Sequence, residues 1–211
     1  MKVTDYNSLY VMSPKYSVRT MPTRINFFSE EWNKEPRGRS RDLGLGTYLP
    51  PYRLQFLYQN KRPPLDYMET TGMTPIFSTR LVEVLIREGI TGWSSYEITM
   101  IGKYNKRQEI PGFVGIQILG RVKDYDYSRS VPCFYQARYA IVEERKGIYF
   151  LDDEYDGSDF LTTDRGGRLV VTQRVKNIFD EHKFTGPEFT PLPEATFSLY
   201  IFRKWLSLQK G

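Results

Sequence analysis

One sequence pattern occurs twice, and it constrains the fold more than any other feature of the chain. Residues 77–92 read FSTRLVEVLIREGITG, and residues 171–186 read VTQRVKNIFDEHKFTG. Each copy places a hydroxyl residue before an apolar stripe, has an arginine two positions further on, and ends on Thr-Gly. The offset is constant without gaps, since 172 − 78 = 94 and 186 − 92 = 94. The chain is therefore predicted to use one structural unit twice, as a pseudo-symmetric pair.

In each copy the pattern predicts a short amphipathic helix that follows a strand. Ser78 and Thr172 are the expected N-caps, because a hydroxyl can accept a hydrogen bond from an amide of the first turn. Apolar residues recur with helical spacing at Leu81, Val84 and Leu85, and again at Val175, Ile178 and Phe179. Gly89 favours a helix end, and Ile90 and Phe184 are expected to return to the core.

Most of the remaining apolar segments are typical of strands, so the predicted fold class is α+β. We expect two related strand–helix–strand halves packed as one compact pseudo-symmetric unit. The N-terminal half is predicted to span residues 1–122, with the first repeat unit at 76–98. The C-terminal half is predicted to span residues 123–211, with the second repeat unit at 170–192 and a terminal element.

The terminal element reads ATFSLYIFRKWLSLQKG. Its apolar residues fall on one helical face, which favours a docked helix; they are Phe197, Tyr200, Ile201, Trp205 and Leu208. The piece TFSLYIF is equally compatible with a strand.

Composition favours a folded cytoplasmic protein. Hydrophobic residues make up 40% of the 211 residues and charged residues 26%, with a net charge of +5. The N-terminus has no apolar segment typical of a signal peptide, and no stretch approaches the roughly 20 apolar residues needed to span a bilayer. We therefore expect a soluble protein without a membrane partner.

No familiar catalytic pattern is present, and the chain is predicted not to be an enzyme and to hold no cofactor. His182 is the single histidine and falls on the charged side of the second helix. Cys133 is the single cysteine, so an all-cysteine zinc site cannot form within one chain. Its apolar neighbours indicate a small buried side chain, and no metal site is predicted.

The strongest local charge feature is an acidic run. Its residues, which we predict to bind a partner, are Asp152, Asp153, Glu154, Tyr155, Asp156 and Asp159. The run resembles the start of a calcium loop, but the position of that loop's bidentate glutamate falls on Thr163. A solvated acidic turn, a contact surface for a basic partner and a hydrolase that uses Asp156 are the alternatives.

Two basic clusters suggest a second kind of partner. One lies in the predicted loop NKEPRGRSRDLGLG (33–46), at Lys34, Arg37, Arg39 and Arg41. The other comprises Lys103, Lys106 and Arg107, beside Tyr104. Phosphate contacts need such charges and base stacking needs such an aromatic ring. Neither cluster matches a named nucleic-acid-binding module, so this partner is the less favoured alternative.

The segment GSDFLTTDRGGRLVVTQRVKNIFDEHKFTGPEFTPL (157–192) resembles the C-terminal signature of a group of bacterial polymorphic-toxin immunity proteins, the double-CXXCG motif family and its relatives. The residues that carry the resemblance are Asp159, Phe160, Thr172, Arg174, Phe184, Gly186, Phe189 and Leu192. The first repeat, TPIFSTRLVEVLIREGITG, resembles the earlier strand–helix unit of the same family.

The resemblance implies a non-enzymatic protein that binds a cognate toxin in the producing cell and blocks it. The cysteine motifs that name the family are degenerate here, because Cys133 remains whereas Gln136 and Ala137 stand where the second motif has Cys and Gly. We therefore expect that the family's four-thiolate zinc site has been lost. The net charge of +5 argues against a nuclease as the toxin, unless the acidic run makes the contact.

Overall fold

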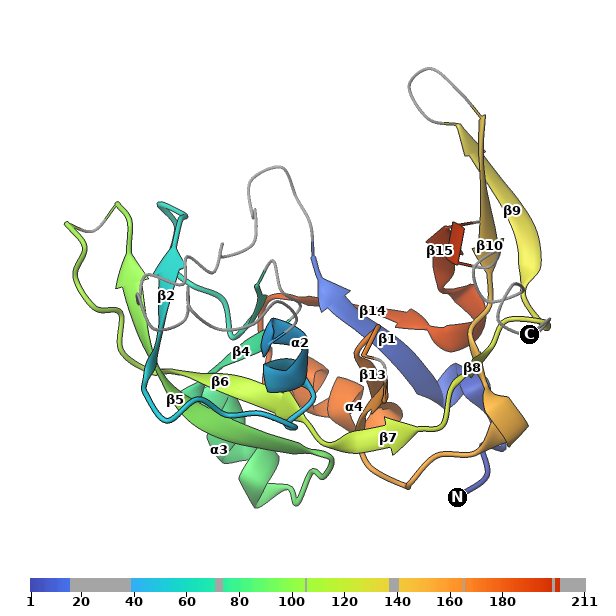
Figure 1. Cartoon of the computed structure of the whole chain (residues 1–211), viewed down its shortest axis with the longest axis horizontal. Coiled ribbons are helices and arrows are strands. Elements are labelled where there is room, and N and C mark those ends of the chain that lie inside the picture. The colour runs from blue at the N-terminus through green and yellow to red at the C-terminus, as the bar shows by residue number, and fades with distance from the viewer. Residues whose placement is uncertain are drawn as a thin grey trace.

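The computed structural model describes residues 1–15, 39–70, 74–104, 106–136, 141–164, 166–198 and 200–201. Within these residues the fold is mixed α and β, with three α-helices and several sheets that are built mostly from short strands (Figure 1). The predicted α+β class is confirmed. Among the described helices, none is long and apolar enough to cross a membrane.

The helices are short and the strands are numerous. The α-helices are α2 (Arg39–Gly44), α3 (Thr79–Arg87) and α4 (Gln173–Glu181), and the 3₁₀ turns are η1 (Tyr6–Ser8), η2 (Leu151–Asp153) and η3 (Leu192–Glu194). The strands up to residue 122 are β1 (Leu9–Pro14), β2 (Leu54–Tyr58), β3 (Tyr67–Glu69), β4 (Pro75–Ser78), β5 (Trp93–Gly102), β6 (Phe113–Ile118) and β7 (Gly120–Val122). Those that follow are β8 (Tyr125–Asp126), β9 (Val131–Gln136), β10 (Ile141–Lys146), β11 (Tyr149–Phe150), β12 (Phe160–Thr163), β13 (Val170–Thr172), β14 (Pro187–Pro191) and β15 (Thr196–Ser198).

Two five-stranded sheets hold the repeats. One has the order β2-β5-β6-β4-β3 and the other β14-β1-β13-β12-β7. The pairs β2–β5 and β7–β12 are parallel, and the remaining pairs in both sheets are antiparallel. A three-stranded sheet, β15-β10-β9, and the pair β11–β8 complete the described sheets.

The two predicted helices occur where the repeat places them. Helices α3 and α4 each have nine residues, and each begins directly after the predicted cap. Ser78 caps α3, because its hydroxyl accepts a hydrogen bond from the Leu81 amide at 3.2 Å. Thr172 occupies the N-cap position of α4, but its hydroxyl does not bind the helix; it donates to Asp159 instead. The cap residue was predicted correctly, whereas the partner of the second hydroxyl was not.

The strands around the two repeats follow the same order. The first repeat lies in the order β3-β4-β6-β5 and the second in the order β12-β13-β1-β14. Ser78 pairs with Phe113 in the first sheet, as Thr172 pairs with Leu9 in the second. The third strand of each set differs in origin: β6 follows the first repeat, whereas β1 comes from the start of the chain. The second sheet therefore forms only when the N-terminal strand pairs across nearly the whole sequence.

Both repeats contribute to one hydrophobic core. A single cluster of buried side chains contains the helix faces and the residues that return to the core after each helix; it includes Leu81, Leu85, Ile90, Val175, Phe179 and Phe184. The ring of Phe77 from the first unit lies 5.9 Å from the ring of Phe160 beside the second. Burial of this shared apolar surface stabilises the packing of one repeat against the other.

One sequence prediction needs correction. Residues 39–44 were predicted to be loop but form α2, because Leu43 is fully buried and anchors this short helix in a third apolar cluster. Of the two alternatives for TFSLYIF, the strand is found at Phe197, which lies in β15 and is buried. Trp205 and Leu208 lie outside the described residues.

The burial of the helix faces yields a stability prediction. Leu85→Ala and Phe179→Ala should each lower the free energy of unfolding by about 2–5 kcal/mol, because both side chains are almost fully buried (0% and 2% exposed). Ile86→Ala is the matched control, since Ile86 is 66% exposed on α3, and should change it by less than about 0.5 kcal/mol. Urea unfolding of the three variants measures this. Near-neutral effects at both buried positions would contradict the assigned helix faces.

Candidate functional site

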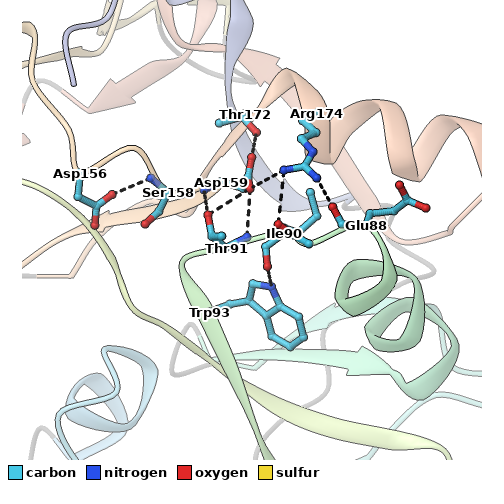
Figure 2. Close-up of polar contacts among 10 residues, drawn as sticks. Glu88, Ile90, Thr91, Trp93, Asp156, Ser158, Asp159, Thr172 and Arg174 are labelled. Atoms are coloured by element: carbon cyan, nitrogen blue, oxygen red, sulfur yellow. Dashed lines mark hydrogen bonds and ion pairs between the residues drawn. The ribbon is translucent and has the colours of Figure 1, made fainter.

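Asp159 joins the two repeats at the N-terminus of α4 (Figure 2). Its carboxylate accepts hydrogen bonds from the Thr172 hydroxyl at 2.8 Å and from the backbone amide of Thr91 at 3.0 Å. The Thr91 hydroxyl donates to it at 3.2 Å, and Arg174 forms an ion pair with it at 3.5 Å. Thr91 belongs to the Thr-Gly end of the first repeat, whereas Thr172 and Arg174 belong to the second. One buried carboxylate therefore connects the end of one unit to the start of the other.

Asp66 makes the corresponding contacts with the start of the first repeat and the end of the second. It accepts from the Ser78 hydroxyl at 2.8 Å and forms an ion pair with Arg80 at 2.8 Å, both at the start of the first repeat. It also accepts from the amide and the hydroxyl of Thr185, each at 2.9 Å, at the end of the second repeat. We call Asp66 and Asp159 together the reciprocal aspartate pair.

The backbone closes each of these junctions. The amide of Tyr67 donates to the carbonyl of Thr185 at 3.0 Å, and the amide of Phe160 donates to the carbonyl of Thr91 at 3.1 Å. This close approach requires glycine next in sequence: a Cβ atom on Gly186 would collide with the carbonyl oxygen of Tyr67, as one on Gly92 would with that of Phe160. Both glycines also have positive φ, +117° and +84°.

The arginines shared by the repeats now have a structural role. Arg80 binds Asp66 through two nitrogens and lies over the ring of Phe184, with its guanidinium carbon 4.6 Å from the ring centre. Arg174 binds Asp159 and also donates to the backbone carbonyl of Glu88 at the end of α3. Each arginine thus contacts the other repeat as well as its own aspartate.

Sequence analysis missed Asp66. The available signal was a second acid–aromatic pair, since Asp66-Tyr67 stands before the first repeat as Asp159-Phe160 stands before the second. Burial disfavours the ionised form of Asp66, but hydrogen bonds from the amide of Thr185 and from Arg80, Ser78 and the Thr185 hydroxyl outweigh it. The pKa of Asp66 therefore lies below its usual value.

Three aspartates of the predicted acidic run bind residues from elsewhere in the fold. Asp159 is 8% exposed and belongs to the reciprocal aspartate pair. Asp153 accepts from the Tyr6 hydroxyl at 2.7 Å and from Arg129 at 2.5 Å, and these contacts lower the pKa of its carboxyl. Asp156 accepts from the backbone amide of Arg121 at 2.6 Å.

Asp156 is exposed despite this contact, and the other three members of the run are partly or fully exposed. The carbonyl of Tyr155 accepts from the N-terminal ammonium of Met1 at 2.7 Å, and its ring is partly buried. Asp152 forms an exposed ion pair with Lys123 at 3.3 Å. The side chain of Glu154 is exposed. Asp152, Glu154 and Asp156 are therefore exposed, and of these three only Asp156 binds a backbone group of the described residues through its side chain.

An apolar surface that the sequence analysis did not select lies on the β9–β10 hairpin. This hairpin projects from the rest of the molecule (Figure 1). Phe134 is 67% exposed and Ile141 is 71% exposed, and the register places them on one face in neighbouring pairs. Val131 and Tyr135 are also exposed on β9. Among the described strands β9 pairs only with β10, so its outer edge is free.

The first basic cluster and Cys133, which the sequence analysis also considered, have the following surroundings. Lys34 and Arg37 of the first basic cluster lie outside the described residues. Arg39 pairs with Asp42 at 3.5 Å, and Arg41 donates to the carbonyl of Asp164 at 3.1 Å. Cys133 is half-buried in β9 rather than fully buried. Within the described part of the chain, no cluster of three His, Cys, Asp or Glu side chains could hold a metal ion.

Comparison of the chain with models of known protein families and with curated protein sequences gives no match.

The reciprocal aspartate pair yields the second prediction. Asp66→Asn and Asp159→Asn should each lower the free energy of unfolding by about 2–4 kcal/mol, because a buried amide cannot accept the same set of charge-assisted hydrogen bonds. Chemical denaturation at pH 7 measures the loss. Asp180→Asn is the matched control: it removes an exposed pair with Lys176 and should cost less than about 1 kcal/mol.

The effect of Asp66→Asn should also depend on pH. Because the pKa of Asp66 is lower in the folded than in the unfolded protein, its charge stabilises the fold fully above about pH 4, the unfolded value, and progressively less as the pH falls. The stability difference between the wild type and Asp66→Asn should therefore shrink from pH 7 towards pH 2. An unchanged difference would show that the carboxylate charge does not support the junction.

Proposed function

We propose that this protein is a non-catalytic immunity protein that binds a cognate bacterial toxin in the cytoplasm of the producing cell and neutralises it. The exposed apolar edge of the β9–β10 hairpin is the observation that carries this function. Exposed apolar edge strands are a liability for a protein on its own, because they pair with other chains. Recognition by strand addition uses the same feature: backbone hydrogen bonds give affinity and side-chain pockets give specificity.

We further propose that the two halves form one pseudo-symmetric unit, as the repeat predicts. The matching strand orders and the reciprocal aspartate pair support this arrangement. It makes the repeats a rigid scaffold, since their conspicuous polar residues bind each other. The toxin contact then belongs to elements that the repeats do not share, chiefly the hairpin and the exposed members of the acidic run.

Glu143 lies opposite Phe134 on the hairpin and supplies a charge beside this contact, and we propose that Asp152 and Glu154 offer further charged groups to the same partner. Both are exposed, and Glu143 on the hairpin is exposed as well. Charged groups around an apolar centre speed association and select among partners more than they add affinity. A toxin surface with an apolar strand and basic residues beside it would complement these features.

Co-expression with the toxin encoded by the neighbouring gene tests the function. The wild-type protein should restore growth, and Phe134→Asp combined with Ile141→Asp should abolish the rescue, because charges would replace the apolar face of the hairpin. Ile86→Asp is the matched control, since Ile86 is an equally exposed apolar residue on α3, and it should still rescue growth.

Two results would count against this function. A neighbouring toxin that still kills in the presence of folded wild-type protein would contradict the immunity role. Rescue by the folded hairpin variant would contradict the hairpin as the contact, and then Asp152→Asn with Glu154→Gln tests these two acidic groups in the same assay.

A nucleic-acid partner remains the second candidate, because Tyr104 lies between two lysines. The ammonium groups of Lys61 and Lys103 lie 5.6 Å and 5.5 Å from the centre of its ring, and Tyr104 is 54% exposed. An exposed ring flanked by cations suits base stacking beside phosphate. Filter binding of single-stranded RNA and DNA at low salt tests this candidate: Tyr104→Ala should weaken retention, and absence of retention by the wild type would eliminate it.

A further inference from the structure

A pocket lies between the two five-stranded sheets, and no residue of the hairpin or of the acidic run lines it. Its volume is about 210 Å³, and it is lined by helix α2, by strands β3, β4, β6 and β12, and by residues 166–169. Its wall is largely apolar, and includes Leu45, Pro75, Ile118 and Leu169. Concave apolar sites with a few polar groups are the usual form of small-molecule sites.

Two charged side chains line this pocket among the described residues, and they have opposite signs. Glu69 is partly buried at the end of β3, where it pairs with Pro75, and its side chain makes no hydrogen bond or ion pair with any other described residue. Burial raises the pKa of its carboxyl to about 7, because the ionised form loses hydration. Arg41 is exposed on α2 and donates one hydrogen bond, to the carbonyl of Asp164 at 3.1 Å. Its planar group therefore has further N–H donors available.

We propose that this pocket binds a small free amino acid with an apolar side chain. The ammonium group would pair with Glu69 inside the pocket and the carboxylate with Arg41 at its exposed rim, while the side chain packs against the apolar wall. Such a ligand would pair with the partly buried carboxylate, which loses hydration and has no partner among the described residues. A guanidinium group matches a carboxylate with two parallel hydrogen bonds.

The opposite charges of the two lining side chains distinguish this ligand from simpler ions. A monovalent amine would pair with Glu69 but make no ion pair with Arg41. A simple carboxylate would pair with Arg41 but would be repelled by the negative charge of Glu69. The zwitterion complements both groups at once. The pocket is therefore expected to rank the three chemistries in the order zwitterion, amine and carboxylate.

Isothermal titration calorimetry of the full chain with three matched probes tests the proposal. L-leucine carries both charges, 3-methylbutylamine lacks the carboxylate, and 4-methylpentanoate lacks the ammonium group. At pH 8, L-leucine should bind most tightly, the amine at least about tenfold more weakly, and the acid without measurable affinity. Absence of saturable L-leucine binding, or tighter binding of the acid, would overturn the proposal.

Two variants identify the charged contacts. Glu69→Gln should weaken L-leucine and the amine about tenfold or more, whereas Arg41→Gln should weaken L-leucine and leave the amine unchanged. Glu69→Gln should fold, since it removes a charge that has no partner among the described residues, and an unchanged or raised Tm at pH 8 checks this. L-leucine binding that survives Glu69→Gln would overturn the assignment.

The pH dependence gives a further check on the same site. Glu69 and Arg41 are the charged side chains that line the pocket among the described residues. Because the ammonium contact requires ionised Glu69, affinity for L-leucine should fall about tenfold from pH 6 to pH 5. An affinity that does not change over this range would contradict a Glu69 contact.

Discussion

Two aspartates hold this fold together, because each connects the start of one repeat to the end of the other. Asp159 binds Thr172 and Arg174 of the second repeat and Thr91 of the first, and Asp66 makes the reciprocal contacts. The contacts lie over one hydrophobic core that both repeats share. Neither repeat buries its apolar face without the other, so the polar junctions and the core should form in one cooperative transition.

The residues that stabilise the fold and those available to a partner lie in different parts of the sequence. The residues that the two repeats have in common are the caps, the arginines, the buried helix faces and the Thr-Gly ends, and all of them contribute to the junction between the units. What remains available to a partner lies outside the shared pattern. The β9–β10 hairpin carries exposed apolar side chains, and β9 has an edge that no other described strand pairs with. The pocket between the sheets holds a carboxylate, that of Glu69, with no partner among the described residues. We propose toxin binding at the hairpin and a small ligand in the pocket.

Local features of the fold could be predicted from the sequence, because capping and amphipathic spacing act over a few residues. Helices α3 and α4, their buried faces and the returning residues Ile90 and Phe184 follow from such patterns. Long-range contacts could not be predicted from the sequence. The pairing of β1 with β13, and of Asp66 with Thr185, joins residues more than a hundred positions apart. The acid–aromatic pair at Asp66-Tyr67 could have singled out Asp66, but no local pattern indicates its partner. The acidic run illustrates the same limit, since Asp159 carries a charge like its neighbours but is buried by contacts from both repeats.

Hydrogen exchange measured on the free protein and on its complex with the toxin tests the central claim most directly. If the hairpin is the contact, backbone amides of β9 and β10 should exchange rapidly in the free protein and become protected on binding, because a partner strand would supply acceptors along the free edge. The repeats should change little, since their junctions are complete before binding. Protection confined to other surfaces, or no complex between the two purified proteins, would contradict the account.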